Sequence, residues 1–285
     1  MLGRPETELL MTFSSLADVM DANAPAMLLA AGRGERMRPL TDTCPKPLLP
    51  VRGKALMQWH LEALARAGVA RVVVNTAWLG DHISQRFKDV FVLQPLSNKG
   101  KQLFKEQRLQ MLYSHEGRDF GGALETAGGI CRALPLLCPT PAAPGGDVFW
   151  VLAGDVYTPG FEFAGASVAR FAASKALAHL WLVPNPAHNR RGDFGLDAAG
   201  LALNLVADDP RPRYTYSTIG LYRAALFASP WCDVAPGNPQ GLKAAMAPLL
   251  RAAMDQGRVS AELYTGAWTD VGTPQRLAQL NGEAA

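Results

Sequence analysis

The chain has 285 residues, of which 48% are hydrophobic and 19% charged, and its formal net charge is +3. This composition is close to the average of folded globular domains and excludes a chain that is disordered throughout. The small net charge gives no argument for nucleic acid or an anionic membrane surface as a partner. No apolar run approaches the ~20 residues that a membrane-spanning helix needs.

The first 24 residues are expected to be an extension without a function of its own. They contain one arginine and four acidic residues, whereas a secretory signal begins with basic residues. A short amphipathic helix is expected around Leu9 to Met20. The rest of the chain, residues 25–285, is expected to form a single domain.

The cysteines are four in number and lie far apart, without a Cys-x-x-Cys pair. This usage predicts neither a disulfide framework nor a zinc site, and it is typical of reduced thiols. We therefore expect a cytoplasmic protein.

Beyond the extension, apolar runs typical of buried strands alternate with helical patterns. Leu56 to Ala67 has apolar residues at helical spacing and is followed by Gly68, a residue that commonly ends helices. The runs that predict strands are 26–31, 71–75, 147–153 and 180–183. Strands alternating with helices predict an α/β fold with a doubly wound, mostly parallel sheet.

Two segments interrupt this alternation. Residues 90–110 contain Pro95, Gly100 and several lysines, and they predict a long loop whose basic side chains are solvated. Residues 139–146 read PTPAAPGG and predict a surface loop.

The most informative segment follows the first predicted strand. It reads LAAGRGERMRPLT and continues three residues later as PKPLLP. Gly32 and Gly34 allow backbone N–H groups to approach a phosphate chain, because no Cβ intervenes. Arg36 and Lys46 add cations that can neutralise a triphosphate.

Two other phosphate-binding motifs do not fit this segment. The dinucleotide fingerprint needs a third glycine, and that position holds Met37. A P-loop needs a Lys-Ser or Lys-Thr pair at a fixed distance after its first glycine, and none is present.

The segment resembles the signature of the sugar-1-phosphate nucleotidyltransferases, approximately GGxGxRLxPLT followed by PKPLLPV. Further stretches are similar to one branch, the N-acetylmuramate-1-phosphate uridylyltransferases: NTAWLG, LETAGGI, GDV, GDF and WTDVGT. The resemblance covers about residues 26 to 280. It implies a Rossmann-like nucleotidyltransferase fold with a small sugar-binding subregion.

Two aspartates are candidates for a metal site. Asp155 directly follows a predicted strand, at the end where open α/β sheets place ligands, and Asp270 lies in the WTDVGT stretch. Two carboxylates beside a triphosphate form a hard oxygen site that suits Mg²⁺. The resemblance implies this role for both residues, and it implies a catalytic role for Asp155 together with Arg36 and Lys46.

The resemblance also implies two groups of substrate-binding residues. The nucleotide is expected at Ala30, Ala31, Gly32, Gly34, Asn75 and Gly128. The sugar phosphate is expected at Glu125, Asn185, Asp193, Thr218 and Glu262. Residues 125–129 are expected to form a second glycine-rich turn before a helix that begins near Ile130. His188 is expected to be solvated rather than catalytic.

The implied reaction joins UTP and a sugar 1-phosphate, N-acetylmuramate 1-phosphate, into UDP-N-acetylmuramate and pyrophosphate, in peptidoglycan recycling. The chain has no nucleophile elbow and no histidine pair at metal-binding spacing, which fits direct displacement by the sugar phosphate. One alternative is a guanylyl- or thymidylyltransferase for another sugar 1-phosphate, such as mannose 1-phosphate. A second is a catalytically silent nucleotide-binding module, which the presence of Arg36, Lys46, Asp155 and Asp270 disfavours.

Overall fold

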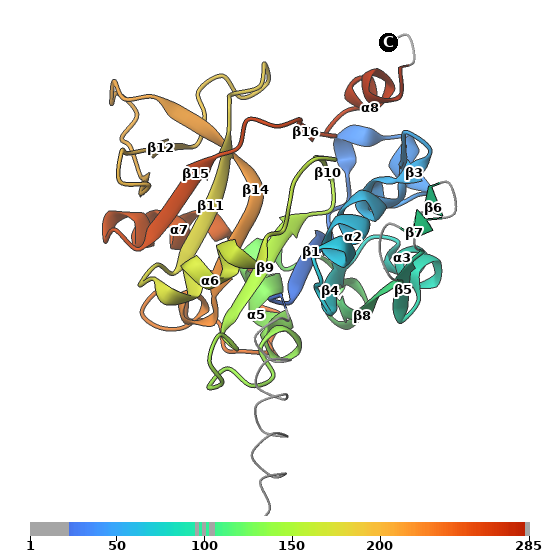
Figure 1. Cartoon of the computed structure of the whole chain (residues 1–285), viewed down its shortest axis with the longest axis horizontal. Helices are drawn as coiled ribbons and strands as arrows, with labels where there is room; N and C mark the ends of the chain where they lie inside the picture. Colours follow the sequence, from blue (N-terminus) through green and yellow to red (C-terminus); the bar gives the residue numbers. More distant parts are fainter. Residues whose placement is uncertain (1–22, 95–96, 99–100, 103–105, 283–285) are drawn as a thin grey trace, which may run out of the picture.

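The structure is a computed structural model, and it describes residues 23–94, 97–98, 101–102 and 106–282. Among these residues, ten strands form one sheet in the order β13-β12-β14-β9-β1-β4-β8-β5, with β11 paired to β14 and β15 paired to β11 (Figure 1). The strands are β1 (Ala26–Ala30), β4 (Arg71–Thr76), β5 (Val90–Leu93), β8 (Gln107–His115), β9 (Val148–Ala153), β11 (Ala178–Val183), β12 (Phe194–Leu196), β13 (Ala202–Leu203), β14 (Arg213–Arg223) and β15 (Val259–Leu263). Three small two-stranded sheets pair β2 (Pro50–Val51) with β3 (Lys54–Ala55), β6 (Ser97–Asn98) with β7 (Lys101–Gln102), and β10 (Val156–Tyr157) with β16 (Thr269–Asp270).

The centre of the large sheet is parallel. Leu29 of β1 is paired with Ala153 of β9 and with Asn75 of β4, and β8 continues the parallel order beside β4. Antiparallel strands flank this centre, with β14 beside β9 and β5 beside β8. The predicted mostly parallel sheet is confirmed, and each of the four predicted strands is present.

Helices cover both faces of the sheet because successive strand residues point to opposite sides. Met27 packs in a core with α5 and α7, and the next residue, Leu28, packs in a second core with α2, α3 and α6. The helices are α2 (Leu56–Arg66), α3 (Gly80–Phe87), α4 (Glu116–Phe120), α5 (Glu125–Leu137), α6 (Gly165–Ala173), α7 (Met246–Asp255) and α8 (Pro274–Asn281). The predicted doubly wound arrangement is therefore confirmed.

Two local predictions are wrong in part. Strands β5 and β8 occupy the two ends of the expected loop 90–110, because Phe91 and Leu109 join the core. Helix α5 begins at Glu125 instead of near Ile130. The amide of Ala127 donates to the carbonyl of Ala244, 2.9 Å away, so the chain outside the helix satisfies a donor of its first turn.

Several predictions concern residues outside the described part. The helix expected around Leu9 to Met20 lies outside it, and so do the side chains of Lys99, Lys101 and Lys105. Near the expected end of the extension, Asn23 is buried, and its amide donates to the carbonyls of Phe163 and Ala67 at 2.6 and 3.1 Å. Asn23 therefore packs against the domain.

The C-terminal segment connects two distant parts of the molecule. From β15 the chain runs across the top of the view in Figure 1 to β16 and then to α8. There Val271 and Leu277 share a small core with Met37, Leu49 and Tyr157. This packing fixes β16 against β10 and so places Asp270 near Asp155.

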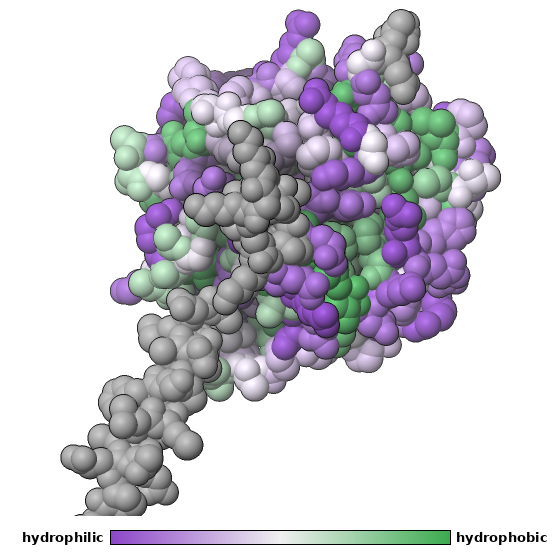
Figure 2. Space-filling model, turned by 45° about the vertical axis from the view of Figure 1, so that its right-hand side comes forward, coloured by the Kyte–Doolittle hydropathy of each residue, from purple (hydrophilic) through white to green (hydrophobic). Residues whose placement is uncertain are grey.

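The surface carries both hydrophilic and hydrophobic residues. In Figure 2 hydrophilic residues predominate on the face that is shown, with hydrophobic patches between them. No helix in the described ranges has both the length and the apolar character needed to cross a membrane.

His60 of α2 anchors the strand that follows Asp155. Its ring is buried, and Nε2 lies 2.7 Å from the carbonyl oxygen of Val156, so the neutral ring donates a hydrogen bond there. Burial lowers the pKa of His60 from 6.5 to about 4, although the carbonyl of Val156 and the charge of Asp155 act in the opposite direction.

We expect this histidine to make stability depend on pH. In the unfolded chain His60 binds a proton near pH 6.5, whereas in the folded protein it does so only near pH 4. The free energy of unfolding should therefore fall as the pH is lowered from 6.5 toward 4, by up to ~1.4 kcal/mol per pH unit. Urea unfolding of His60→Gln should lack this contribution, and His82→Gln, at an exposed position, should retain it. An equally steep fall in His60→Gln would contradict the assignment.

Candidate active site

A cavity of about 880 Å³ opens at the carboxyl ends of β9, β1 and β4. Its walls are the glycine-rich segment after β1, the start of α5, one side of α7, and residues of β12 and β14. Open α/β sheets bind ligands at this end of their strands. The cavity is therefore the place where the predicted site residues should meet.

The conformation of the segment after β1 requires one of its two glycines. Gly34 has φ +70°, and a Cβ there would lie 3.0 Å from Cγ2 of Thr41. The hydroxyl of Thr41 donates to the carbonyl of Gly34, 2.9 Å away, and closes the turn. Gly32 has no atom within 4 Å of an added Cβ, so its backbone faces open space in the cavity wall.

A side-chain clamp holds this segment against the end of β4. The guanidinium of Arg33 lies 3.8 Å from the ring centroid of Trp78. Nη1 of Arg33 and Nε1 of Trp78 both donate to the carbonyl of Thr41, at 2.8 and 2.9 Å. The turn is thus fixed by contacts that leave its cavity side free.

The two predicted cations differ in their surroundings. Lys46 is buried, and its Nζ lies 2.5 Å from Oδ2 of Asp155. Arg36 is exposed at the cavity, and no described residue forms an ion pair or side-chain hydrogen bond with it. Arg36 is therefore available to an anionic ligand, whereas Lys46 is held in place by Asp155.

The two candidate metal ligands lie on paired strands. Asp270 is the register partner of Val156, and the amide of Val271 donates to the carbonyl of Asp155 at 3.0 Å. The pairing places the backbones of Asp155 and Asp270 side by side, and Asp155 lines the cavity. A metal site shared by their carboxylates stays a prediction. Within the described ranges, no group of three or more His, Cys, Asp or Glu side chains could hold a metal ion.

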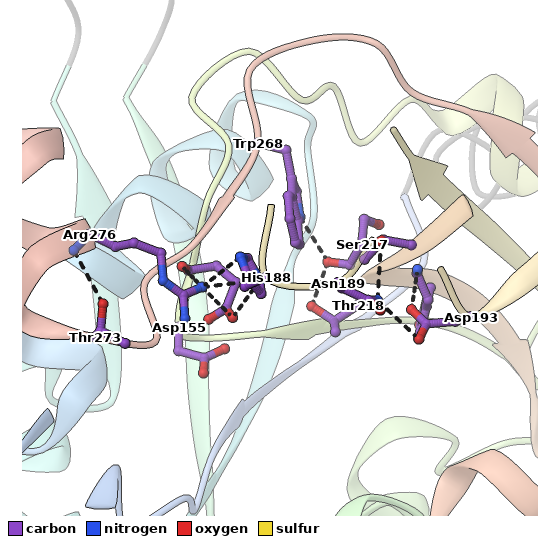
Figure 3. Close-up of polar contacts among 12 residues, drawn as sticks. Asp155, His188, Asn189, Asp193, Ser217, Thr218, Trp268, Thr273 and Arg276 are labelled. Atoms are coloured by element: carbon purple, nitrogen blue, oxygen red, sulfur yellow. Dashed lines mark hydrogen bonds and ion pairs between the residues drawn. The ribbon is translucent and has the colours of Figure 1, made fainter. Parts of the chain in front are cut away.

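The carboxylate of Asp270 contacts an arginine and a histidine. Its Oδ2 lies 2.8 Å from Nη1 of Arg276 and 3.4 Å from Nε2 of His188 (Figure 3). A Cβ on Gly272 would lie 2.7 Å from Nη2 of Arg276, so glycine leaves room for this approach. His188, expected to be solvated, is 38% exposed and contacts this pair.

A buried polar network links the end of β1 to the start of α5. Oδ1 of Asn75 accepts from the amide of Ala30 at 2.9 Å, and Nδ2 donates to Oε1 of Glu116 at 2.7 Å. Oε2 of Glu116 accepts from the amide of Leu124 at 2.8 Å. Burial raises the pKa of Glu116, and these donors oppose that shift.

Most of the predicted nucleotide residues line the cavity: Ala30, Ala31, Gly32, Gly34 and Asn75. Gly128 does not. Its amide donates to the carbonyl of Ala244 at 3.1 Å, and a Cβ would lie 2.5 Å from the carbonyl oxygen of Leu242. Gly128 packs α5 against the chain before α7, and its contact with a nucleotide stays a prediction.

Of the residues predicted to bind the sugar phosphate, Glu125, Asp193 and Thr218 line the cavity. Oδ2 of Asp193 accepts from the amide of Tyr216 at 2.8 Å, and Oδ1 accepts from Nδ2 of Asn189 at 3.2 Å (Figure 3). Thr218 has φ +66°, a strained value for a residue with a branched side chain. Asp193, directly before β12, and Thr218 of β14 lie on one wall of the cavity, whereas Glu125 lies at the start of α5.

The structure separates the remaining two from the cavity. Nδ2 of Asn185 donates to the carbonyl of Arg213 at 2.9 Å, so Asn185 braces the loop before β12. Glu262 is the register partner of Trp181, and its Oε1 accepts from Nε1 of that residue at 2.5 Å. Both side chains are thus bonded to groups that do not line the cavity, and their contact with the sugar phosphate stays a prediction.

Several cavity residues were not predicted. Glu116 lies in the polar sequence SHEGRD, which has no motif that indicates a buried acid. Met246, Leu250 and Arg251 line the cavity from α7. Their spacing predicts one helix face, but only the fold shows that this face borders the cavity.

We expect Asn75→Ala to destabilise the protein by ~1–3 kcal/mol, because it leaves the amide of Ala30 and the carboxyl of Glu116 without a buried partner. Urea unfolding at neutral pH measures this change. Gln85→Ala, which removes an exposed amide side chain, should have little effect. Equal stability of the two variants would show that the network contributes nothing.

Comparisons with known proteins agree with the motifs. Residues 25–285 match the model of the nucleotidyl transferase family. The chain is 42% identical to an N-acetylmuramate alpha-1-phosphate uridylyltransferase from Neisseria meningitidis over 91% of this chain and 97% of that protein. It is 31% identical to a protein of the same name from Caulobacter vibrioides, over 91% and 95%.

A solved structure supports the fold. A crystal structure from Bacillus anthracis, described as a glucose-1-phosphate thymidylyltransferase in complex with a sucrose, superposes with a TM-score of 0.65. It covers 91% of this chain and 94% of its own, at 19% identity, which bears on the fold alone. With a family match from residue 25 to the end, the chain is an enzyme of the nucleotidyl transferase family and belongs to its sugar-1-phosphate nucleotidyltransferases.

Proposed function

We propose that this enzyme transfers a uridylyl group from UTP to N-acetylmuramate 1-phosphate, giving UDP-N-acetylmuramate and pyrophosphate. The observation that carries this proposal is the cavity in which the glycine-rich segment, Arg36 and the Lys46–Asp155 pair meet a sugar-side wall. The choice of base and sugar follows the names of the two relatives matched over most of the chain. We place the reaction in peptidoglycan recycling, in the cytoplasm.

The reaction needs positioning and charge neutralisation more than covalent chemistry. An oxygen of the sugar phosphate attacks the α-phosphorus of UTP, the new oxygen–phosphorus bond forms, and the bond to the β-phosphate oxygen breaks. Pyrophosphate takes the electron pair of that bond. The exposed guanidinium of Arg36 contacts the departing pyrophosphate, and the buried Lys46 contacts the phosphate at the reacting centre.

The donor set fits a magnesium ion. Asp155 and Asp270 supply carboxylate oxygens from paired strands, and Mg²⁺ usually completes its shell with phosphate oxygens and waters. When bound, such an ion neutralises phosphate charge. Lys46 and Arg276 each place a nitrogen within 2.8 Å of one of the two carboxylates.

The scaffold around the phosphates positions the base and the ribose. The backbone of Gly32 is open to the cavity, and the Asn75–Glu116 network fixes the end of β1 relative to the start of α5. Because these bonds are buried and fully partnered, the wall should move little when the nucleotide binds.

Pyrophosphate release with each nucleotide–sugar pair tests the proposal. We expect the highest kcat/KM with UTP and N-acetylmuramate 1-phosphate. The comparison substrates are GTP and dTTP with the same sugar, and mannose 1-phosphate with each nucleotide. Faster turnover of a guanylyl or thymidylyl pair would replace the proposed specificity, and nucleotide binding without turnover would indicate a silent module.

Removing the buried cation should abolish most of the activity. Lys46→Ala is expected to lower kcat by about 100- to 1,000-fold, because a group that stabilises transition-state charge is lost. Lys175→Ala, which changes an exposed lysine, should keep the wild-type rate. Folding of Lys46→Ala is checked by its urea midpoint, and full turnover in a folded variant would exclude Lys46 from the reaction.

The metal assignment predicts a change in the Mg²⁺ requirement. Asp270→Asn should need a higher Mg²⁺ concentration for half-maximal activity, since one anionic ligand becomes neutral. Asp233→Asn, at an exposed position, is the matched control. Direct titration with Mn²⁺, followed by its paramagnetic resonance signal, should show the same weakening without turnover. Identical titrations for the Asp270 variant and the control would remove Asp270 from the site.

A further inference from the structure

The sugar-side wall of the cavity combines apolar residues with one cation. The apolar side chains are Val151, Phe194, Tyr216, Tyr222, Met246 and Leu250. Arg251, on the same side of α7 as Leu250 and Met246, also lines the cavity. It belongs to neither the glycine-rich segment nor the Asp155–Asp270 region.

Arg251 is held in place by neutral groups. Its Nη1 donates to Oδ1 of Asn204 at 2.6 Å, and its guanidinium carbon lies 5.2 Å from the ring centroid of Phe194. Nδ2 of Asn204 donates to both carboxylate oxygens of Asp255, at 3.0 and 3.1 Å. These bonds orient the amide of Asn204 so that its oxygen faces Arg251.

The charge of Arg251 has no counter-ion among the described residues. Two other partly buried arginines are paired with acids, Arg223 with Asp147 and Arg276 with Asp270. A guanidinium has five N–H donors, and Arg251 uses one of its terminal nitrogens on Asn204. Donors of a fixed cation therefore remain free at the cavity wall.

We propose that Arg251 binds a carboxylate carried by the sugar itself and so selects the sugar 1-phosphate. This inference rests on the proposed function, because N-acetylmuramate differs from N-acetylglucosamine by a lactyl ether that ends in a carboxylate. Phe194, which lies beneath Arg251, directly follows the sugar-side residue Asp193 in the sequence. The cations assigned to the phosphates, Arg36 and Lys46, come from a different part of the chain, before β2.

The apolar neighbours strengthen such a contact. Phe194, Met246 and Leu250 line the same cavity as Arg251, and a charge-assisted hydrogen bond gains strength where apolar side chains lower the local dielectric. The same side chains offer a surface for the methyl group of the lactyl ether. Arg251 is thus a specificity-determining residue that leaves the reacting phosphates untouched.

The test compares two sugars in two proteins, with UTP and Mg²⁺ present throughout. In the wild type, kcat/KM for N-acetylmuramate 1-phosphate should exceed that for N-acetylglucosamine 1-phosphate. Arg251→Gln should lower the muramate value about 10- to 100-fold, mainly through KM, and leave the glucosamine value unchanged. Arg86→Gln, at an exposed arginine of α3, should change neither value.

A change in the substrate gives an independent measurement. Converting the lactyl carboxylate to its amide should lower the kcat/KM of the wild type by about the same factor. The same change in the substrate should lower the kcat/KM of Arg251→Gln little further. An equal loss with both sugars in Arg251→Gln, or no loss with either, would overturn the role of Arg251 while wild-type uridylyl transfer still stands. A wild type that transfers uridylyl to neither sugar would overturn the proposed function and this inference together.

Discussion

The site depends on the register of three parallel strands. β9, β1 and β4 are paired so that Ala153, Leu29 and Asn75 lie side by side, and the chain leaves all three strands at one edge of the sheet. Asp155 and the glycine-rich segment follow two of these ends directly, and Asn75 lies near the third. Because a shift by one residue would turn every side chain to the other face, the buried cores on both sides fix this register. Side chains from distant parts of the sequence thereby line one cavity.

Two aspartates at the proposed phosphate site have cationic partners, whereas two arginines of the cavity lining have none among the described residues. Lys46 forms an ion pair with Asp155, and Arg276 forms one with Asp270. Arg36 and Arg251 line the cavity without a carboxylate partner in the described part of the chain. A phosphate chain at Arg36 and a carboxylate of the bound sugar at Arg251 would give both arginines an anionic partner. Electrostatic complementarity of this kind favours specificity more than raw affinity.

The sequence predicted the framework of the fold and several residues that line the cavity. Apolar runs and the glycine motif predict β1, β4, β9 and the position of Arg36, Lys46 and Asp155, because these signals are local. Gly128 packs α5 against a neighbouring segment, and in a sequence a glycine that allows close packing resembles one that allows ligand approach. Asn185 and Glu262 are bonded to Arg213 and Trp181, partners that lie far along the chain and that no local pattern predicts. Glu116 and Arg251 were missed because tertiary packing alone gives them their roles.

In the proposed reaction, the glycine-rich segment, Arg36, Lys46 and the two aspartates surround a single polyphosphate. A crystal structure with a non-hydrolysable UTP analogue and Mn²⁺, with the metal located by its anomalous scattering, tests this arrangement. We expect a triphosphate between Gly32 and Asp155, contacted by Arg36 and Lys46, with the metal peak at the carboxylates of Asp155 and Asp270. A nucleotide bound outside this cavity, or a metal peak distant from both carboxylates, would contradict it.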